Sequence, residues 1–402
     1  MKIKIILLAL IILLPVSLSA ADFGLVVNIN GGYGGYGEED HNFDYKADFW
    51  PRFSALLGDN GELLITAGLT LGMTDEDFYY VPELLHTELT MRFGSSGIRL
   101  GRINYSDPLS FIAEGLFDGF QFFHSSGAGH FHIGAWYTGF LYKKNAQIAM
   151  TANDLEILNN DLDYDDFFNT YFAPKRAFMS MGWEHPSIGE LLHLNTAIIG
   201  QVDLSDSDSW YHSQYLIIKA QVPINQFLIE LGGSLETSQI ADEEPFTMAF
   251  AAEAGFSWLF ASVYNSRLSL TGRIAGGRID DTFTAFTPIT TKHYGVIFQQ
   301  NISGLSVFTL DYSSRVTQTL GASATASYFV RNDLGTYNTY PVNPDNNGYF
   351  LGPEFSARVI WSPASDLQLN LTGGAFVPAL GDAGPKEKLQ WRVELTATIA
   401  LL

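Results

Sequence analysis

The chain has 402 residues, a formal net charge of −21, 14% aromatic residues and no cysteine. The lack of cysteine excludes a disulfide scaffold, a thiolate metal site and an acylated N-terminal cysteine. The acidic balance disfavours polyanions, so we expect no nucleic-acid partner.

The first residues have the order of a secretory signal peptide. Lys2 and Lys4 precede an apolar run over residues 5–14, and small residues follow, with Ser19 and Ala21 as the expected recognition pair. The apolar run is short against the roughly 20 residues that a membrane helix needs. We therefore predict a signal peptide at residues 1–21, whose removal would change the formal net charge from −21 to about −23.

The rest of the chain, residues 22–402, reads as one domain of alternating strands and turns. Residues 63–73 and 388–402 show the pattern most clearly, because every second side chain is apolar. In the last stretch the apolar face holds Trp391, Val393, Leu395, Ala397, Ile399 and Leu401, and the polar face holds Gln390, Arg392, Glu394, Thr396 and Thr398. An outer-membrane barrel turns such an apolar face to lipid and the polar face to its lumen.

The connections between strands are of two alternating kinds. Short turns are expected at residues 58–61, 95–97, 126–129, 186–190, 225–226, 303–304 and 363–366. Longer acidic loops are expected at residues 38–40, 74–77, 154–166, 203–208, 242–244, 280–281 and 332–347. Short turns at one end and long loops at the other are typical of outer-membrane barrels.

These observations predict an all-β fold, a single transmembrane antiparallel β-barrel after a cleaved signal peptide. Counting with both chain ends on the short-turn side gives about 18 strands, provided that residues 320–347 form one external loop. A hairpin hidden in that stretch would give about 20 strands, and merging a weak pair would give about 16.

Two segments carry a resemblance to a known family. Residues 100–120 read LGRINYSDPLSFIAEGLFDGF, and residues 349–381 read YFLGPEFSARVIWSPASDLQLNLTGGAFVPALG. The chain resembles the alginate-export-like porins in these segments, with Gly101, Arg102, Asp107, Phe117, Asp118 and Gly119 at the positions of the first motif. The resemblance implies a monomeric channel in which Arg102 lines a constriction and Asp107 and Asp118 brace it.

Two departures bear on this resemblance. Alginate would favour a strongly basic lumen, but the inward pattern of this chain also holds carboxylates such as Asp44, Glu88 and Glu253. The chain ends in Leu402, where proteobacterial barrels commonly have an aromatic residue.

Several arginines fall on the polar faces of the predicted strands. We expect these side chains to line the pore: Arg92, Arg102, Arg176, Arg273, Arg315 and Arg358, together with Arg99, Arg267 and Arg392. Arginine stays charged and presents a planar set of donors, so the group would suit a track for anionic solutes. The alternative is that the arginines pair with lumen carboxylates and brace the wall.

No motif predicts catalysis, a metal or a cofactor. The acidic run at residues 161–166 lacks the glycine and the glutamate of a helix-loop-helix calcium site, with Asp166 and Phe172 at those positions. His130 and His132 share a strand face, but no third metal ligand is evident. Neither a Gly-x-Ser-x-Gly nor a His-Glu-x-x-His pattern is present, so we do not expect an enzyme.

The sequence predicts a channel integral to the outer membrane of a Gram-negative-type envelope, exported by its signal peptide. Its expected partners are outer-membrane lipid and small hydrophilic solutes that diffuse passively, with selectivity set by pore width and lumen charge. An alternative is a surface adhesin or ligand-binding barrel that acts through residues 154–175 and 320–347.

Overall fold

The computed structural model describes residues 18–37, 40–74, 77–205, 210–240, 246–260, 264–279, 283–334, 348–383 and 389–401. Most of the predicted signal peptide, residues 1–17, lies outside the described residues. The first described strand begins at Leu18, so cleavage after Ala21 would remove its first few residues.

Eighteen described strands form one sheet, and each pairs antiparallel with its neighbours in the chain. The strands are β1 (Leu18–Tyr36), β2 (Asp40–Leu57), β3 (Gly61–Thr74), β4 (Asp77–Phe93), β5 (Ser96–Ser106), β6 (Glu114–Ser126), β7 (Gly129–Tyr137), β8 (Arg176–Ile188), β9 (Leu192–Asp203), β10 (Tyr211–Ile224), β11 (Phe227–Ile240), β12 (Thr247–Phe260), β13 (Ser266–Ala275), β14 (Leu305–Arg315), β15 (Leu320–Arg331), β16 (Phe350–Ala364), β17 (Leu367–Phe376) and β18 (Gln390–Leu401).

The helices are short and lie in connections. They are α2 (Lys143–Ala146), α3 (Ala152–Asn159), α4 (Phe167–Tyr171) and the 3-10 helix η1 (Pro378–Leu380). None of the helices in the described ranges is long and apolar enough to cross a membrane.

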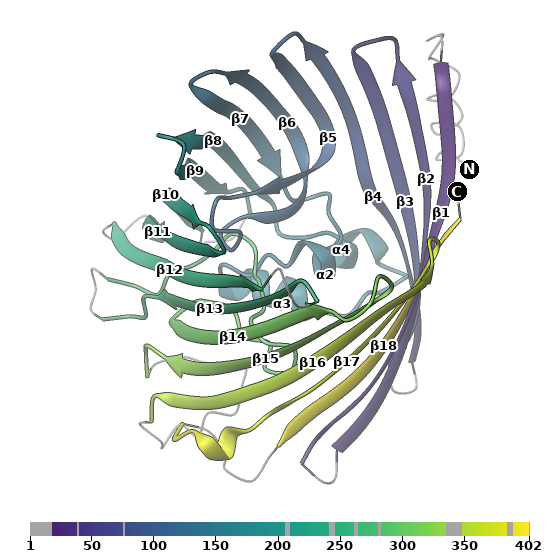
Figure 1. The fold of residues 1–402 in the computed structure, drawn as a ribbon. Helices are drawn as coiled ribbons and strands as arrows, with labels where there is room; N and C mark the ends of the chain where they lie inside the picture. The colour runs from purple at the N-terminus through teal and green to yellow at the C-terminus, as the bar shows by residue number, and fades with distance from the viewer. Residues whose placement is uncertain are drawn as a thin grey trace.

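The sheet closes because β1 pairs with both β2 and β18, in a register that sets Leu25 opposite Leu401 (Figure 1). The alternation of side chains follows the prediction along most strands. Leu69 and Leu395 are exposed on the outer face, whereas Asp48, on the inner face of β2, is buried and accepts a hydrogen bond from Thr70 (2.6 Å). The predicted 18-stranded all-β barrel is therefore confirmed.

The strand count is right although two connections were predicted wrongly. Residues 320–331 form strand β15 and not part of an external loop. Conversely, residues 303–304 end a long connection between β13 and β14 instead of forming a short turn. The sequence of β15, LGASATASYFVR, is rich in small residues, so its alternation of apolar and polar side chains is weak. The two errors cancel in the total.

Strand β4 departs from a regular ladder. A β-bulge between Thr66 and Ala67 of β3 leaves Leu85 of β4 as the extra residue. Leu85 then points to the same side as Gly68, into the lumen, whereas simple alternation predicts that it faces lipid with Leu89. In the part of β4 that precedes this bulge in the chain, the lumen-facing residues have odd numbers, and Tyr80 and Leu84 are exposed on the outer face.

Candidate channel and its constriction

The loop between β5 and β6, residues 107–113, folds into the lumen around Asp107. The Asp107 carboxylate accepts hydrogen bonds from the backbone N–H groups of Leu109 (2.8 Å), Ser110 (3.1 Å), Ile112 (2.8 Å) and Ala113 (2.9 Å). Burial raises the pKa of this carboxyl, while the four N–H groups act in the opposite direction. Asp107 therefore shapes the loop from within and does not contact Arg102.

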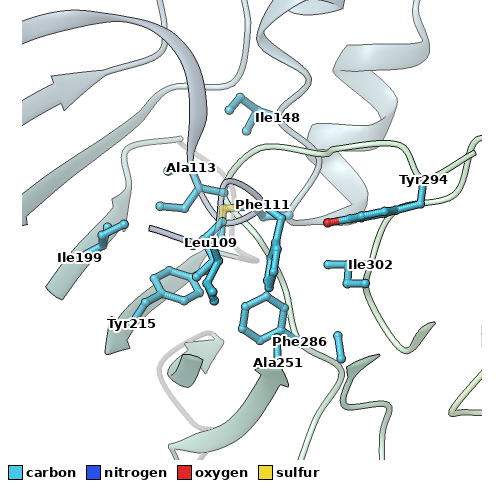
Figure 2. Packing of buried hydrophobic residues seen from close by; sticks show 14 of the residues in the cluster. Leu109, Phe111, Ala113, Ile148, Ile199, Tyr215, Ala251, Phe286, Tyr294 and Ile302 are labelled. Atoms are coloured by element: carbon cyan, nitrogen blue, oxygen red, sulfur yellow. The ribbon is translucent and has the colours of Figure 1, made fainter. Parts of the chain in front are cut away.

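The connection between β13 and β14, whose described parts are residues 276–279 and 283–304, packs against this loop. The N–H groups of Ile289 (2.8 Å) and Thr290 (3.0 Å) both donate to the Ile112 carbonyl. Phe286 packs edge-on against Phe111, with ring centroids 6.3 Å apart. Figure 2 shows these side chains meeting with Tyr215 of the barrel wall, so the two loops share an apolar core inside the barrel.

Glu354 of β16 anchors the same connection to the wall. It is 2% exposed, and its carboxylate accepts hydrogen bonds from the N–H groups of Val296 (2.6 Å), Ile297 (3.0 Å) and Phe298 (2.7 Å). Gly295, at a φ of +88°, makes the turn that points these N–H groups at the carboxylate. Converging N–H groups form a favourable site for a negative charge, which Glu354 supplies.

Glu236 of β11 makes a second anchor. Its buried carboxylate accepts hydrogen bonds from the N–H of Thr287 (2.8 Å) and from the hydroxyls of Tyr211 (2.7 Å) and Tyr215 (3.2 Å). The single proton of the Tyr215 hydroxyl is shared between Glu236 and the Thr287 carbonyl, which lies closer (2.5 Å). The connection is thus held to the wall at two distant strands, β11 and β16.

The loop between β7 and β8, residues 138–175, also enters the lumen. Arg176 is 0% exposed, and its guanidinium forms ion pairs with Asp154 of α3 (2.6 Å) and with Asp203 of β9 (3.0 Å). The Gln147 carbonyl of this loop accepts a hydrogen bond from the N–H of Thr291 (2.7 Å). The three inward loops are therefore tied to one another as well as to the wall.

A polar cavity of about 400 Å³ remains beside these loops. Glu253 of β12 lies between two cations in its wall, with Lys219 at 3.0 Å and Arg273 at 2.6 Å. The Arg273 guanidinium also lies 5.5 Å from the ring centroid of Tyr294. The lining also carries hydroxyls from the neighbouring strands β14, β15 and β16: Thr309, Thr325, Ser327 and Ser356.

A second cavity of about 450 Å³ lies against β1, β2 and β18, and Val296 lines both. Arg392 in its lining is paired with Asp44 (2.9 Å) and Glu394 (3.4 Å). In both cavities the cations are matched by carboxylates, so the lining is strongly polar but close to charge-balanced. Such a space can admit hydrated polar solutes and orient charges of either sign.

The predicted pore residues lie in different places. Arg273 lines the cavity of about 400 Å³, and Arg176 is buried beneath a loop. Arg92, Arg315 and Arg358 lie toward the short-turn end of the barrel, where Arg315 donates to the Gln318 carbonyl (2.9 Å) and Arg358 to the Thr372 hydroxyl (3.3 Å).

Arg102 and Asp118 pair with each other but do not line either cavity. Arg102 is 5% exposed, and its guanidinium binds both Asp118 oxygens at 3.0 and 2.8 Å. Asp118 shares its strand face with Phe120 and Phe122, which are exposed on the outer side of the barrel. The pair therefore belongs to the wall, where residues of the β7–β8 loop cover it.

Sequence analysis did not identify two cations that line the cavity of about 400 Å³, Lys219 and Lys292. Lys219 shares a strand face with Tyr215 and Ile217, which are buried against the inward loops, so the face does not read as polar. Lys292 lies in a loop, where no periodicity applies, and pairs with Glu114 (2.7 Å). Over the described parts of the chain, no three His, Asp or Glu side chains gather as a metal site.

Comparison with known proteins finds the barrel among solved structures only. No family model matches the chain, and no curated protein matches its sequence. The structure is similar to that of Pseudomonas aeruginosa OccK2 (OpdF), with a TM-score of 0.64 and 12% identity over 96% of this chain and 98% of that one.

Two other solved structures agree with this result. OccK5 (OpdH) of Pseudomonas aeruginosa has a TM-score of 0.59 and 10% identity over 95% of this chain and 99% of its own. The outer-membrane protein opdK of the same organism has a TM-score of 0.59 and 10% identity over 94% and 98%. At these identities the likeness shows the fold alone: the chain has the barrel fold of these outer-membrane proteins.

Proposed function

We propose that this protein is an outer-membrane channel for the passive diffusion of small hydrophilic solutes. The observation that carries the proposal is the polar cavity of about 400 Å³ inside a closed barrel, narrowed by loops that Asp107, Glu236 and Glu354 hold in place. A packed structural core would fill this space with apolar side chains. Here it is lined by charges and hydroxyls that can replace part of a solute's hydration shell.

The expected solutes are about the size of a single sugar or amino acid. Ligand sites for small molecules commonly have volumes of about 300–1,000 Å³, a range that includes this cavity. A similar solved structure, OccK2, is in complex with glucuronate. The lining of Lys219, Arg273 and Glu253, two cations and one carboxylate, suits solutes that carry both polar and charged groups.

The cellular setting belongs to the same proposal. Residues 1–21 would direct export and be removed, and residues 22–402 would insert as a monomeric barrel in the outer membrane. The apolar outer face of β3 and β18 supports contact with lipid. The finer relationship to alginate-export-like porins stays a hypothesis, which rests on residues 100–120 and 349–381.

The channel is a better account of the loops than an adhesin. Residues 154–175 include Asp154, which is buried with Arg176, and residues 320–331 form a strand. Much of the surface that an adhesin would present is therefore used inside the barrel or in its wall.

Swelling of liposomes that contain the purified, folded protein tests the proposal. We expect rapid swelling with monosaccharides and amino acids, slower swelling with disaccharides, and little with larger oligosaccharides. Protein-free liposomes and liposomes with heat-unfolded protein are the controls. If the folded barrel admits none of these solutes, the proposal is wrong.

A further inference from the structure

The wall of the barrel is interrupted between β4 and β5. Pairing of these strands starts at Phe93 opposite Ser96 and stops at Thr87 opposite Arg102. On its other side, β4 continues to pair with β3 as far as Asp77, and β5 pairs with β6 as far as Ser106. Beyond Thr87 and Arg102, therefore, β4 and β5 are not paired with each other.

Three sequence features keep the two strands apart at this point. Pro82 in β4 has no N–H to offer a neighbouring strand. The bulge at Leu85 bends β4 immediately above the last paired residue. Gly101 adopts a φ of +114°, and a Cβ there would collide with the Thr87 carbonyl oxygen, so only glycine fits. The interruption is therefore encoded in the local sequence.

Side chains take the place of the missing strand along the free edge of β4. The Tyr164 hydroxyl accepts from the Tyr80 N–H (2.9 Å) and donates to the Tyr80 carbonyl (3.1 Å). The Tyr171 hydroxyl donates to the Pro82 carbonyl (2.9 Å), and the Arg102 guanidinium donates to the Leu84 carbonyl. Arg102 also donates to the Phe140 carbonyl (2.9 Å), which fixes the start of the β7–β8 loop beside the gap.

The β7–β8 loop spans the wall at this gap. Its outer surface is aromatic: Phe140 and Phe168 are 60% and 67% exposed, and both pack on Phe172. Its inner part reaches the lumen, where Ile148 is buried in the core of the inward loops (Figure 2). In Figure 1 helices α2 and α4 lie between β4 and the ends of β5–β7, in agreement with these contacts.

We propose that this gap is a lateral portal between the lumen and the lipid phase, with residues 160–171 of the β7–β8 loop as its door, and that it passes amphipathic molecules bearing an acyl chain. A continuous strand ladder would close the wall with a row of backbone hydrogen bonds, which break only if the sheet itself separates. The door is instead held to β4 by a few side-chain hydrogen bonds, each of modest net strength, and by stacking of Tyr164 on Tyr80 (4.7 Å). Its aromatic outer surface suits contact with acyl chains. This route is separate from axial diffusion and does not depend on it.

Photolabelling in proteoliposomes tests the portal. A diazirine-bearing palmitate is added to the membrane, and labelled peptides are mapped by mass spectrometry after irradiation. We expect label on the door near Phe168 and, at a lower level, on the lumen loop near Tyr294. The double variant Tyr164→Phe with Tyr171→Phe loses hydroxyl contacts to β4, so lumen labelling should rise about tenfold.

Closing the door gives the opposite expectation. Because the chain has no cysteine, Tyr80→Cys and Tyr164→Cys can be joined selectively with a bismaleimide. The cross-link should abolish label at Tyr294 while leaving label at Phe168. Tyr164→Cys alone, treated alike but unable to cross-link, should label Tyr294 more strongly than wild type, because it lacks the Tyr164 hydroxyl and ring.

The matched control is Tyr137→Phe, whose ring packs on Phe140 (5.0 Å) but whose hydroxyl makes no hydrogen bond to β4 within the described residues. Heat-dependent gel migration confirms that each variant is folded. The portal is ruled out if neither the double variant nor the cross-link changes lumen labelling. It is also ruled out if lumen labelling never appears in the double variant. Axial conductance, measured on the same preparations, is expected in every case, so failure of the portal and failure of the channel are distinguishable.

Discussion

Glu354 on β16 accepts a hydrogen bond from the backbone N–H of Phe298, 2.7 Å away in a loop that crosses the lumen. The contact joins the barrel wall to the element that narrows the channel. By strand alternation, Glu354 should face water in the lumen. Instead, its carboxylate binds backbone N–H groups of the loop.

The variant Glu354→Gln should widen the channel. The amide keeps one acceptor oxygen but presents an N–H₂ group to N–H donors, so anchoring of residues 296–298 should weaken by about 2–3 kcal/mol. We expect a larger single-channel conductance and entry of larger sugars in liposome swelling. Asp311→Asn is the control, because Asp311 accepts from Thr325 of the wall (2.8 Å) and not from a loop. Equal conductance of both variants would contradict the anchoring role.

Glu253→Gln should shift ion preference toward anions. The substitution leaves Lys219 and Arg273 without the carboxylate that lies within 3.0 Å of each. Reversal potentials in asymmetric salt should show an anion-to-cation permeability ratio raised about two- to fivefold, and less at high ionic strength. Glu62→Gln, at an exposed position near a short turn, should leave the ratio unchanged. An unshifted reversal potential for Glu253→Gln would remove this cluster from the permeation path.

Arg176→Met should destabilise the barrel strongly. The substitution leaves the carboxylates of Asp154 and Asp203 buried without their cation, a loss of about 3–5 kcal/mol. Denaturant unfolding in detergent, followed by gel migration, measures the change. Arg315→Met, at an exposed turn, should stay within about 0.5 kcal/mol of wild type. Similar midpoints for the two variants would show that the buried pair adds little.

Asp107→Asn should loosen the loop at residues 107–113. Only one side-chain oxygen remains to accept the N–H groups that now bind both carboxylate oxygens. Amide hydrogen exchange of Ile112 and Ala113 should speed up about tenfold or more, while exchange in β5 stays the same. Unchanged protection of Ile112 would mean that packing of Phe111 holds the loop without Asp107.

Local alternation was enough to predict the barrel. The outer and inner faces of β3 and β18 follow from a period of two, because each strand has one face toward lipid and one toward water. The alternation of short turns and long loops then predicted which end of each strand lies at the short-turn end of the barrel.

The interior could not be predicted in the same way. Glu236 is on a strand position that reads as water-facing, yet it is buried because Thr287, far along the chain, covers it. The sequence pattern predicts Arg102 as a lumen residue, but it lies on the outer face of its strand. There it pairs with Asp118, and the β7–β8 loop covers the pair. Contacts between distant loops leave no periodic signal in one sequence.

Planar-bilayer recording of the purified, folded protein is the decisive test of the channel. We expect discrete conductance steps in wild type and larger steps in Glu354→Gln. A demonstrably folded barrel that produces no steps at any applied voltage would contradict this expectation.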